Sequence, residues 1–87
     1  MQSAEERRIF AVQFGSEMRR ARKQLGMTQS ELATRMQLCG IDISEDRIRK
    51  LETGNLRMGV DEAFVIAHIL FLDLNRRAEI FVDRIMI

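Results

Sequence analysis

Two helix starts that lie close together constrain the fold of this chain more than any other feature of its sequence. Thr28 can cap a helix, and Glu31, three residues later, can return the hydrogen bond, which makes a capping box. Ser44 can cap a second helix in the same way. The sequence therefore predicts two short consecutive helices, over residues 28–38 and 44–53.

Apolar side chains recur at helical steps in the rest of the chain as well. They predict further helices over about residues 5–25, 60–71 and 74–87, and Gly15 within the first marks either a close helix contact or a break. The 87 residues are 46% hydrophobic and include five Gly and no Pro, so no linker divides the chain. We expect one compact all-α domain of five helices over residues 1–87.

This order of helices is the layout of a helix-turn-helix, in which the second of two short helices can lie in the major groove of DNA. Its core would span residues 28–53. Further residues strengthen this interpretation, and they form the series Phe14-Gly15, Met18, Arg22, Gly26, Thr28-Gln29, Glu31-Leu32-Ala33, Ser44, Ile48, Leu51-Glu52 and Gly54, followed by Ala67 and Leu70. The series resembles the phage-repressor-like (XRE/Cro-type) helix-turn-helix family of transcription regulators over roughly residues 14–74. The resemblance implies a lambda-repressor-like DNA-binding domain.

The chain departs from the pattern of that family in one place. Leu32 and Glu52 lie several residues further apart than is usual in the family. We expect the additional residues in the connection between the two short helices, around residues 38–43. The resemblance therefore determines the helices better than it determines the angle between them.

The resemblance also implies where DNA would bind. Helix 44–53 would read bases, while the start of helix 28–38 and the loop after residue 53 would hold the DNA backbone. Lys50 can donate to guanine or to phosphate. For Glu45 and Asp46 two alternatives stay open, since they can accept from cytosine or only stabilise the positive end of the helix dipole. The residues expected to contact DNA are Thr28, Gln29, Ser44, Glu45, Asp46, Arg47, Arg49, Lys50, Asn55 and Arg57.

A structural ion pair is a further implication of the resemblance. Arg22 and Glu52 match positions that form a partly buried pair between the first and third helices of the family. An Arg side chain can hold a carboxylate with two parallel hydrogen bonds. We therefore expect both residues to be architectural rather than in contact with DNA.

The last predicted helix has more apolar residues than one small core can bury. One apolar face of this helix can pack on the core, but four further apolar residues would stay exposed on a monomer: Ile80, Val82, Met86 and Ile87. We expect these four residues to form the interface of a homodimer, to which Ile9 and Val12 could add, and a twofold dimer would set two recognition helices one DNA turn apart. The alternative is that this helix wraps the core more fully.

Composition argues against several other classes of protein. The net charge is only +1, although residues 1–60 are more basic than the rest. One Cys and one His cannot form a four-ligand zinc site, and the longest uncharged apolar run, residues 63–72, is too short to cross a bilayer. The sequence has no catalytic nucleophile and base and no glycine-rich phosphate loop. We expect a cytoplasmic protein that has no enzyme activity, metal, cofactor, small-molecule ligand or membrane partner.

The sequence thus predicts a homodimeric transcription regulator, of the repressor type, that binds double-stranded operator DNA with an inverted repeat. A second interpretation stays open. The near-neutral charge and the acidic Glu45 and Asp46 also fit a protein-interaction module of the same fold that does not bind DNA productively.

Overall fold

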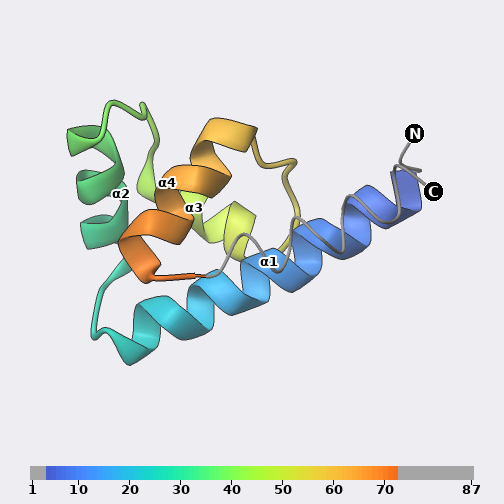
Figure 1. Ribbon diagram of the computed structural model, residues 1–87, viewed down its shortest axis with the longest axis horizontal. Helices are drawn as coiled ribbons and strands as arrows, with labels where there is room; N and C mark the ends of the chain where they lie inside the picture. Colours follow the sequence, from blue (N-terminus) through green and yellow to red (C-terminus); the bar gives the residue numbers. More distant parts are fainter. Residues whose placement is uncertain (1–3, 73–87) are drawn as a thin grey trace.

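A computed structural model describes residues 4–72, which contain four helices and no strand. The all-α class is confirmed. The fifth helix expected over residues 74–87 lies outside the described residues, and so do Ile80, Val82, Met86 and Ile87. The four helices are α1 (Ala4–Gln24), α2 (Gln29–Leu38), α3 (Glu45–Glu52) and α4 (Val60–Leu70), as Figure 1 shows.

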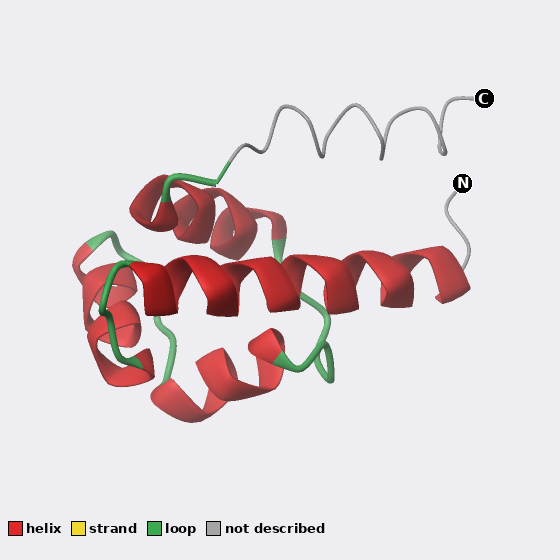
Figure 2. Ribbon diagram, turned by 90° about the horizontal axis from the view of Figure 1, so that it is seen from below, coloured by secondary structure: helices red, strands yellow, loops and turns green. Residues whose placement is uncertain are grey.

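The packing of the helices links each of two helices to both of the others. The long helix α1 and the short helix α2 each pack against both α3 and α4. Figure 2 shows α3 and α4 on opposite sides of α1, with α2 at one end of the molecule. One face of α3 and one face of α4 therefore point outward in opposite directions.

Both predicted helix starts are confirmed by their hydrogen bonds. Thr28 Oγ1 accepts from the Glu31 backbone N–H at 3.0 Å, while Glu31 Oε1 accepts from the Thr28 N–H at 3.2 Å, which completes the capping box. Ser44 Oγ accepts from the Arg47 N–H at 3.1 Å at the start of α3. These local bonds satisfy backbone donors that a helix start would otherwise leave without a partner.

The connection between α2 and α3 is anchored in the core rather than looped out. Gly40 has a φ of +88°, and the Ile41 N–H reaches back to the Met36 carbonyl at 3.0 Å, as in a Schellman ending. Gln37 Nε2 then donates to the Ile43 carbonyl at 2.7 Å, and the Ile43 side chain is buried. The longer connection therefore has a defined path that fixes where α3 begins.

The core takes side chains from all four helices. Its fully buried members come from every described helix, so no pair of helices can bury its apolar face without the others. The largest of them are Phe14, Met18, Leu32, Met36, Ile48, Leu51 and Ile66.

Gly15 marks a close helix contact and not a break, because α1 runs on through it. It is buried where α1 crosses the end of α3. A Cβ atom at this position would lie 2.8 Å from the backbone oxygen of Glu52 and would also meet that of Leu51. Only a residue without a side chain allows α1 to approach α3 this closely.

We predict that Gly15→Ala lowers the free energy of unfolding by about 1–3 kcal/mol, because the methyl group forces α1 away from α3. The gain in helix propensity, about 1 kcal/mol, does not offset this. Thermal or urea unfolding measures the effect. Ser16→Ala at the next, exposed position is the control, and a Gly15→Ala protein as stable as this control contradicts the account.

Candidate nucleic-acid interface

The outer face of α3 is exposed and almost entirely charged. Ile48, Leu51 and Glu52 are buried on the inner side of this eight-residue helix. Glu45, Asp46, Arg49 and Lys50 are all exposed on its outer side. Figure 2 shows that no other described helix lies against that side. Helix α3 is therefore placed where its outer face can meet a ligand as large as a nucleic acid.

The charges on this face are paired within the helix. Lys50 Nζ lies 3.1 Å from Asp46 Oδ2, and Arg49 Nη2 donates to Asp46 Oδ1. The hydrogen bond from Lys50, with the charge of Arg49, holds the pKa of the Asp46 carboxyl below its ordinary value. One carboxylate thus holds both cations of the outer face.

Arg47 differs from its neighbours because it turns toward α4. Its Nε lies 2.6 Å from Glu62 Oε2 and its Nη2 lies 2.7 Å from Glu62 Oε1, a bidentate pair. The same Nη2 donates to the Arg57 carbonyl at 3.3 Å. Among the residues expected to contact DNA, Arg47 is therefore placed to hold α3, the loop and α4 together.

Glu62 holds Arg47 and the start of α4, a role that was not predicted from the sequence. Besides Arg47, its Oε1 accepts from the Gly59 backbone N–H at 2.8 Å, so the same carboxylate caps the start of α4. The hydrogen bond from Arg47 lowers the pKa of Glu62. The available signal was the position of Glu62 three residues after Gly59, which is the spacing of a capping box.

A buried ion pair joins α1 to the end of α3. Arg22 Nε lies 2.6 Å from Glu52 Oε2 and Arg22 Nη2 lies 3.0 Å from Glu52 Oε1. The side chains are only 9% and 2% exposed. Arg22 Nη1 also donates to the Met27 carbonyl at 2.8 Å, so the guanidinium holds the turn that leads into α2. The hydrogen bond to Glu52 raises the pKa of Arg22.

Gln29 belongs to the same network. Its Nε2 donates to Glu52 Oε1 at 3.0 Å, which connects the start of α2 to the end of α3. An amide nitrogen carries two N–H donors, so this bond leaves one that could reach a phosphate. The structure therefore places Gln29 where it can brace α3, at the edge of the exposed surface.

The other expected contacts surround α3 on the surface. Thr28 and Ser44 are exposed at the starts of their helices, with each hydroxyl accepting a cap hydrogen bond. Asn55 and Arg57 are exposed in the loop between α3 and α4. Of the ten residues expected to contact DNA, eight are exposed, and only Gln29 and Arg47 are half-buried.

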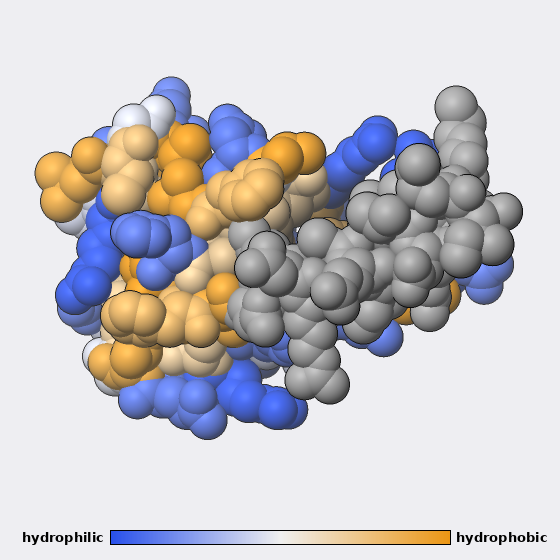
Figure 3. Space-filling view, in the orientation of Figure 1, coloured by the Kyte–Doolittle hydropathy of each residue, from blue (hydrophilic) through white to orange (hydrophobic). Residues whose placement is uncertain are grey.

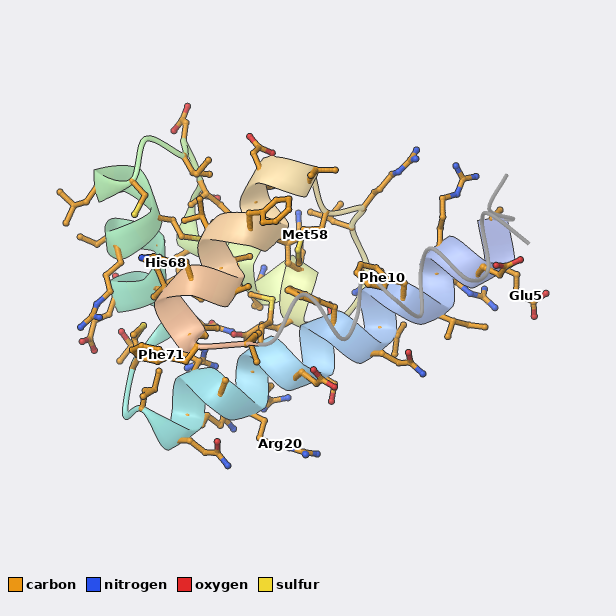
Figure 4. All side chains as sticks on the ribbon, viewed as in Figure 1. Glu5, Phe10, Arg20, Met58, His68 and Phe71 are labelled. Carbon is orange, nitrogen blue, oxygen red and sulfur yellow. The ribbon has the colours of Figure 1, made fainter. Side chains whose placement is uncertain are left out.

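The side of α4 opposite to α3 is apolar. Val60, Phe64 and Phe71 are 74%, 61% and 83% exposed, and His68, which lies between Phe64 and Phe71 in the sequence, is exposed as well. Figure 3 shows apolar side chains gathered on this face of the molecule, and Figure 4 shows His68 on α4 and Phe71 directly after its end. This apolar face of α4 thus lies away from the charged outer face of α3.

We predict that Glu52→Ala lowers the free energy of unfolding by about 3 kcal/mol, because it leaves the buried Arg22 guanidinium without its carboxylate. Chemical unfolding of the full chain measures this loss. The control is Glu45→Ala, which removes an exposed carboxylate and should change stability by less than about 1 kcal/mol. Equal stability of the two variants would show that the Arg22–Glu52 pair contributes little.

Within residues 4–72, no helix has the length and apolar composition that crossing a bilayer requires. The same residues hold no group of three or more His, Cys, Asp or Glu side chains arranged to bind a metal ion.

Comparison with known proteins identifies the family. A family model described as helix-turn-helix matches residues 18–76, which is more than half of the 87 residues. Neither curated proteins nor solved structures gave a match. The matched range contains α2, α3 and α4 and the network around Glu52. The chain belongs to the XRE/Cro-type helix-turn-helix family of DNA-binding regulators.

Proposed function

We propose that this protein binds operator DNA as a homodimer through α3 and represses transcription. The observation that carries the proposal is the exposed outer face of α3, which presents Asp46, Arg49 and Lys50 to solvent while the inner face is buried in the core. An α-helix such as α3 is about 10–12 Å across with its side chains, which suits insertion into a major groove about 12 Å wide.

The residues around α3 would hold the sugar-phosphate backbone. The start of α2 has backbone N–H groups near the exposed Thr28 and the free amide donor of Gln29, and a helix N-terminus attracts an anion. Arg57 and Asn55 lie in the loop after α3 and could donate to a second phosphate. Lys50 would donate to a guanine edge.

The network around Glu52 supports the proposal because it holds α3 rigidly in place. Glu52 accepts hydrogen bonds from Arg22 of α1 and Gln29 of α2, so α3 is tied to both helices at one end. Arg47 ties the same helix to α4 through Glu62. Because these contacts exist without DNA, little ordering of α3 would be needed on binding, which favours affinity.

The proposed dimer interface consists of Ile80, Val82, Met86 and Ile87, which lie outside the described residues. What supports a dimer is the apolar surface left on the described part of the chain, since Phe64 and Phe71 are mostly exposed. Helix α3 lies on the opposite side of α1 (Figure 2), so an apolar contact beside α4 leaves α3 open to DNA. A twofold axis would then require an inverted repeat in the operator.

We further infer a cytoplasmic regulator that has no enzyme activity and needs no cofactor, metal or small-molecule ligand. The family to which the chain belongs consists of DNA-binding regulators, which supports this inference. The alternative is an interaction module of the same fold that does not bind DNA. The acidic Glu45 and Asp46 on the outer face of α3 favour it, and DNA-binding measurements separate the two functions.

We predict that Lys50→Ala weakens binding to the preferred duplex by about 5- to 100-fold, because one contact to a base edge is worth roughly 1–3 kcal/mol. The duplex is obtained by selection from a randomised pool with the full chain, and affinity is measured by fluorescence anisotropy over a range of salt concentrations.

The control for this experiment is Arg20→Ala. Arg20 extends from α1 into solvent (Figure 4), so its removal lowers the positive charge by the same amount without touching α3. An equal effect of both variants would show that only net charge matters. A wild-type protein that binds no duplex at any salt concentration would support the interaction-module alternative, because phosphate contacts make DNA binding strongest at low salt.

We predict that Ile80→Asp combined with Val82→Asp raises the dimer Kd by roughly 100-fold or more, because a carboxylate buried in an apolar interface has no partner. Sedimentation velocity over a concentration series measures this change. Leu38→Asp, at an exposed apolar position in α2, is the control and should leave the dimer intact. A double variant that sediments like the wild-type dimer excludes residues 80 and 82 from the interface.

A further inference from the structure

Asp46 occupies an unusual position on a helix that is proposed to enter DNA. It is exposed on the outer face of α3, one turn before the two cations that face outward with it. Its two carboxylate oxygens are divided between them, since Oδ2 lies 3.1 Å from Lys50 Nζ and Oδ1 accepts from Arg49 Nη2. Each partner is about half exposed, so both pairs can exchange for an outside partner.

The outer face of α3 consequently has almost no net charge to offer to phosphate. Arg49 and Lys50 are balanced by Asp46 and by the exposed Glu45. Arg47 reaches sideways to Glu62 of α4, and this pairing balances its charge. A phosphate that approached Lys50 or Arg49 would have to displace a carboxylate and would then remain beside it, with like charges close together.

A base pair can replace these intrahelical contacts without leaving any charged group unpaired. In the major groove, guanine presents two adjacent acceptors, O6 and N7, and its cytosine partner presents the N4 donor. The two cations can donate to the two guanine acceptors while the Asp46 carboxylate accepts from the cytosine amine. An A·T pair places its donor between two acceptors, so a carboxylate aimed at that donor meets an acceptor on either side.

We propose that Asp46 is a specificity-determining residue. Its carboxylate keeps Arg49 and Lys50 from binding phosphates. When the amine of a cytosine donates to this carboxylate instead, both cations can donate to the guanine of the same G·C pair. This inference rests on the proposed function, since it concerns how the same helix discriminates among DNA sequences. Glu45 has the same charge in the same helical turn and is not assigned this role, because the described residues show no ion pair for it.

The test compares Asp46→Asn with Asp42→Asn in the full chain, since Asp42 is exposed in the connection before α3 and is not among the residues expected to contact DNA. Each variant removes one negative charge and nearly preserves the shape of the side chain. Two duplexes serve as probes for fluorescence anisotropy: the sequence selected by the wild-type protein from a randomised pool, and a mixed-sequence duplex of the same length. Melting temperatures establish that both variants are folded, as expected for changes at exposed positions.

For Asp46→Asn we expect about tenfold tighter binding to the mixed-sequence duplex at low salt. The slope of the logarithm of affinity against the logarithm of salt concentration should steepen by about one to two, because each cation freed to bind phosphate adds about 0.9. A repeated selection with the variant should lose the preference for G·C at one position of each half-site. Asp42→Asn should keep that preference and the wild-type slope to within about 0.5.

Two outcomes overturn the inference while leaving DNA binding intact. In one, Asp46→Asn retains both the salt slope and the base preference of the wild-type protein. In the other, Asp42→Asn produces the same changes as Asp46→Asn, which would assign the effect to net charge. If the wild-type chain and both variants bind neither duplex at any salt concentration, the proposed function fails and the inference fails with it.

Discussion

The carboxylate of Glu52 is the contact on which the geometry of the helix-turn-helix depends. It accepts from Arg22 of α1 and from Gln29 at the start of α2, while its own backbone ends α3. Three helices are therefore held at one buried point. Because the pair is almost fully buried, loss of either charge would leave the other without water or a partner, which is far more destabilising than loss of a surface pair.

Helix α3 has a buried side and an exposed, charged side, which its residues form by the directions in which they point. Ile48 and Leu51 fill the core, and Arg47 reaches sideways to Glu62, so these residues fix the helix in place. The charged residues on the opposite side make no contact with another helix in the described part of the chain. Such a division lets the outer residues change partners without unfolding the domain, which the proposed DNA contacts of Asp46 and Lys50 require.

The local features of this fold were predictable from sequence, and the long-range ones were not. The caps at Thr28 and Ser44 depend on bonds to residues three positions away, so their pattern is visible in the chain. The pairing of Arg47 depends on Glu62, fifteen residues later, and on the packing of α4, so the residues near Arg47 in the sequence do not indicate it. Only the resemblance to a family indicated the Arg22–Glu52 pair.

The central claim is that the outer face of α3 meets DNA. Nuclear magnetic resonance titration of the isotope-labelled full chain with its selected duplex tests it most directly, since backbone amide shifts report contact residue by residue. The account predicts the largest changes at Glu45, Asp46, Arg49 and Lys50. Large changes confined to the apolar side of α4, with α3 unaffected, would contradict it.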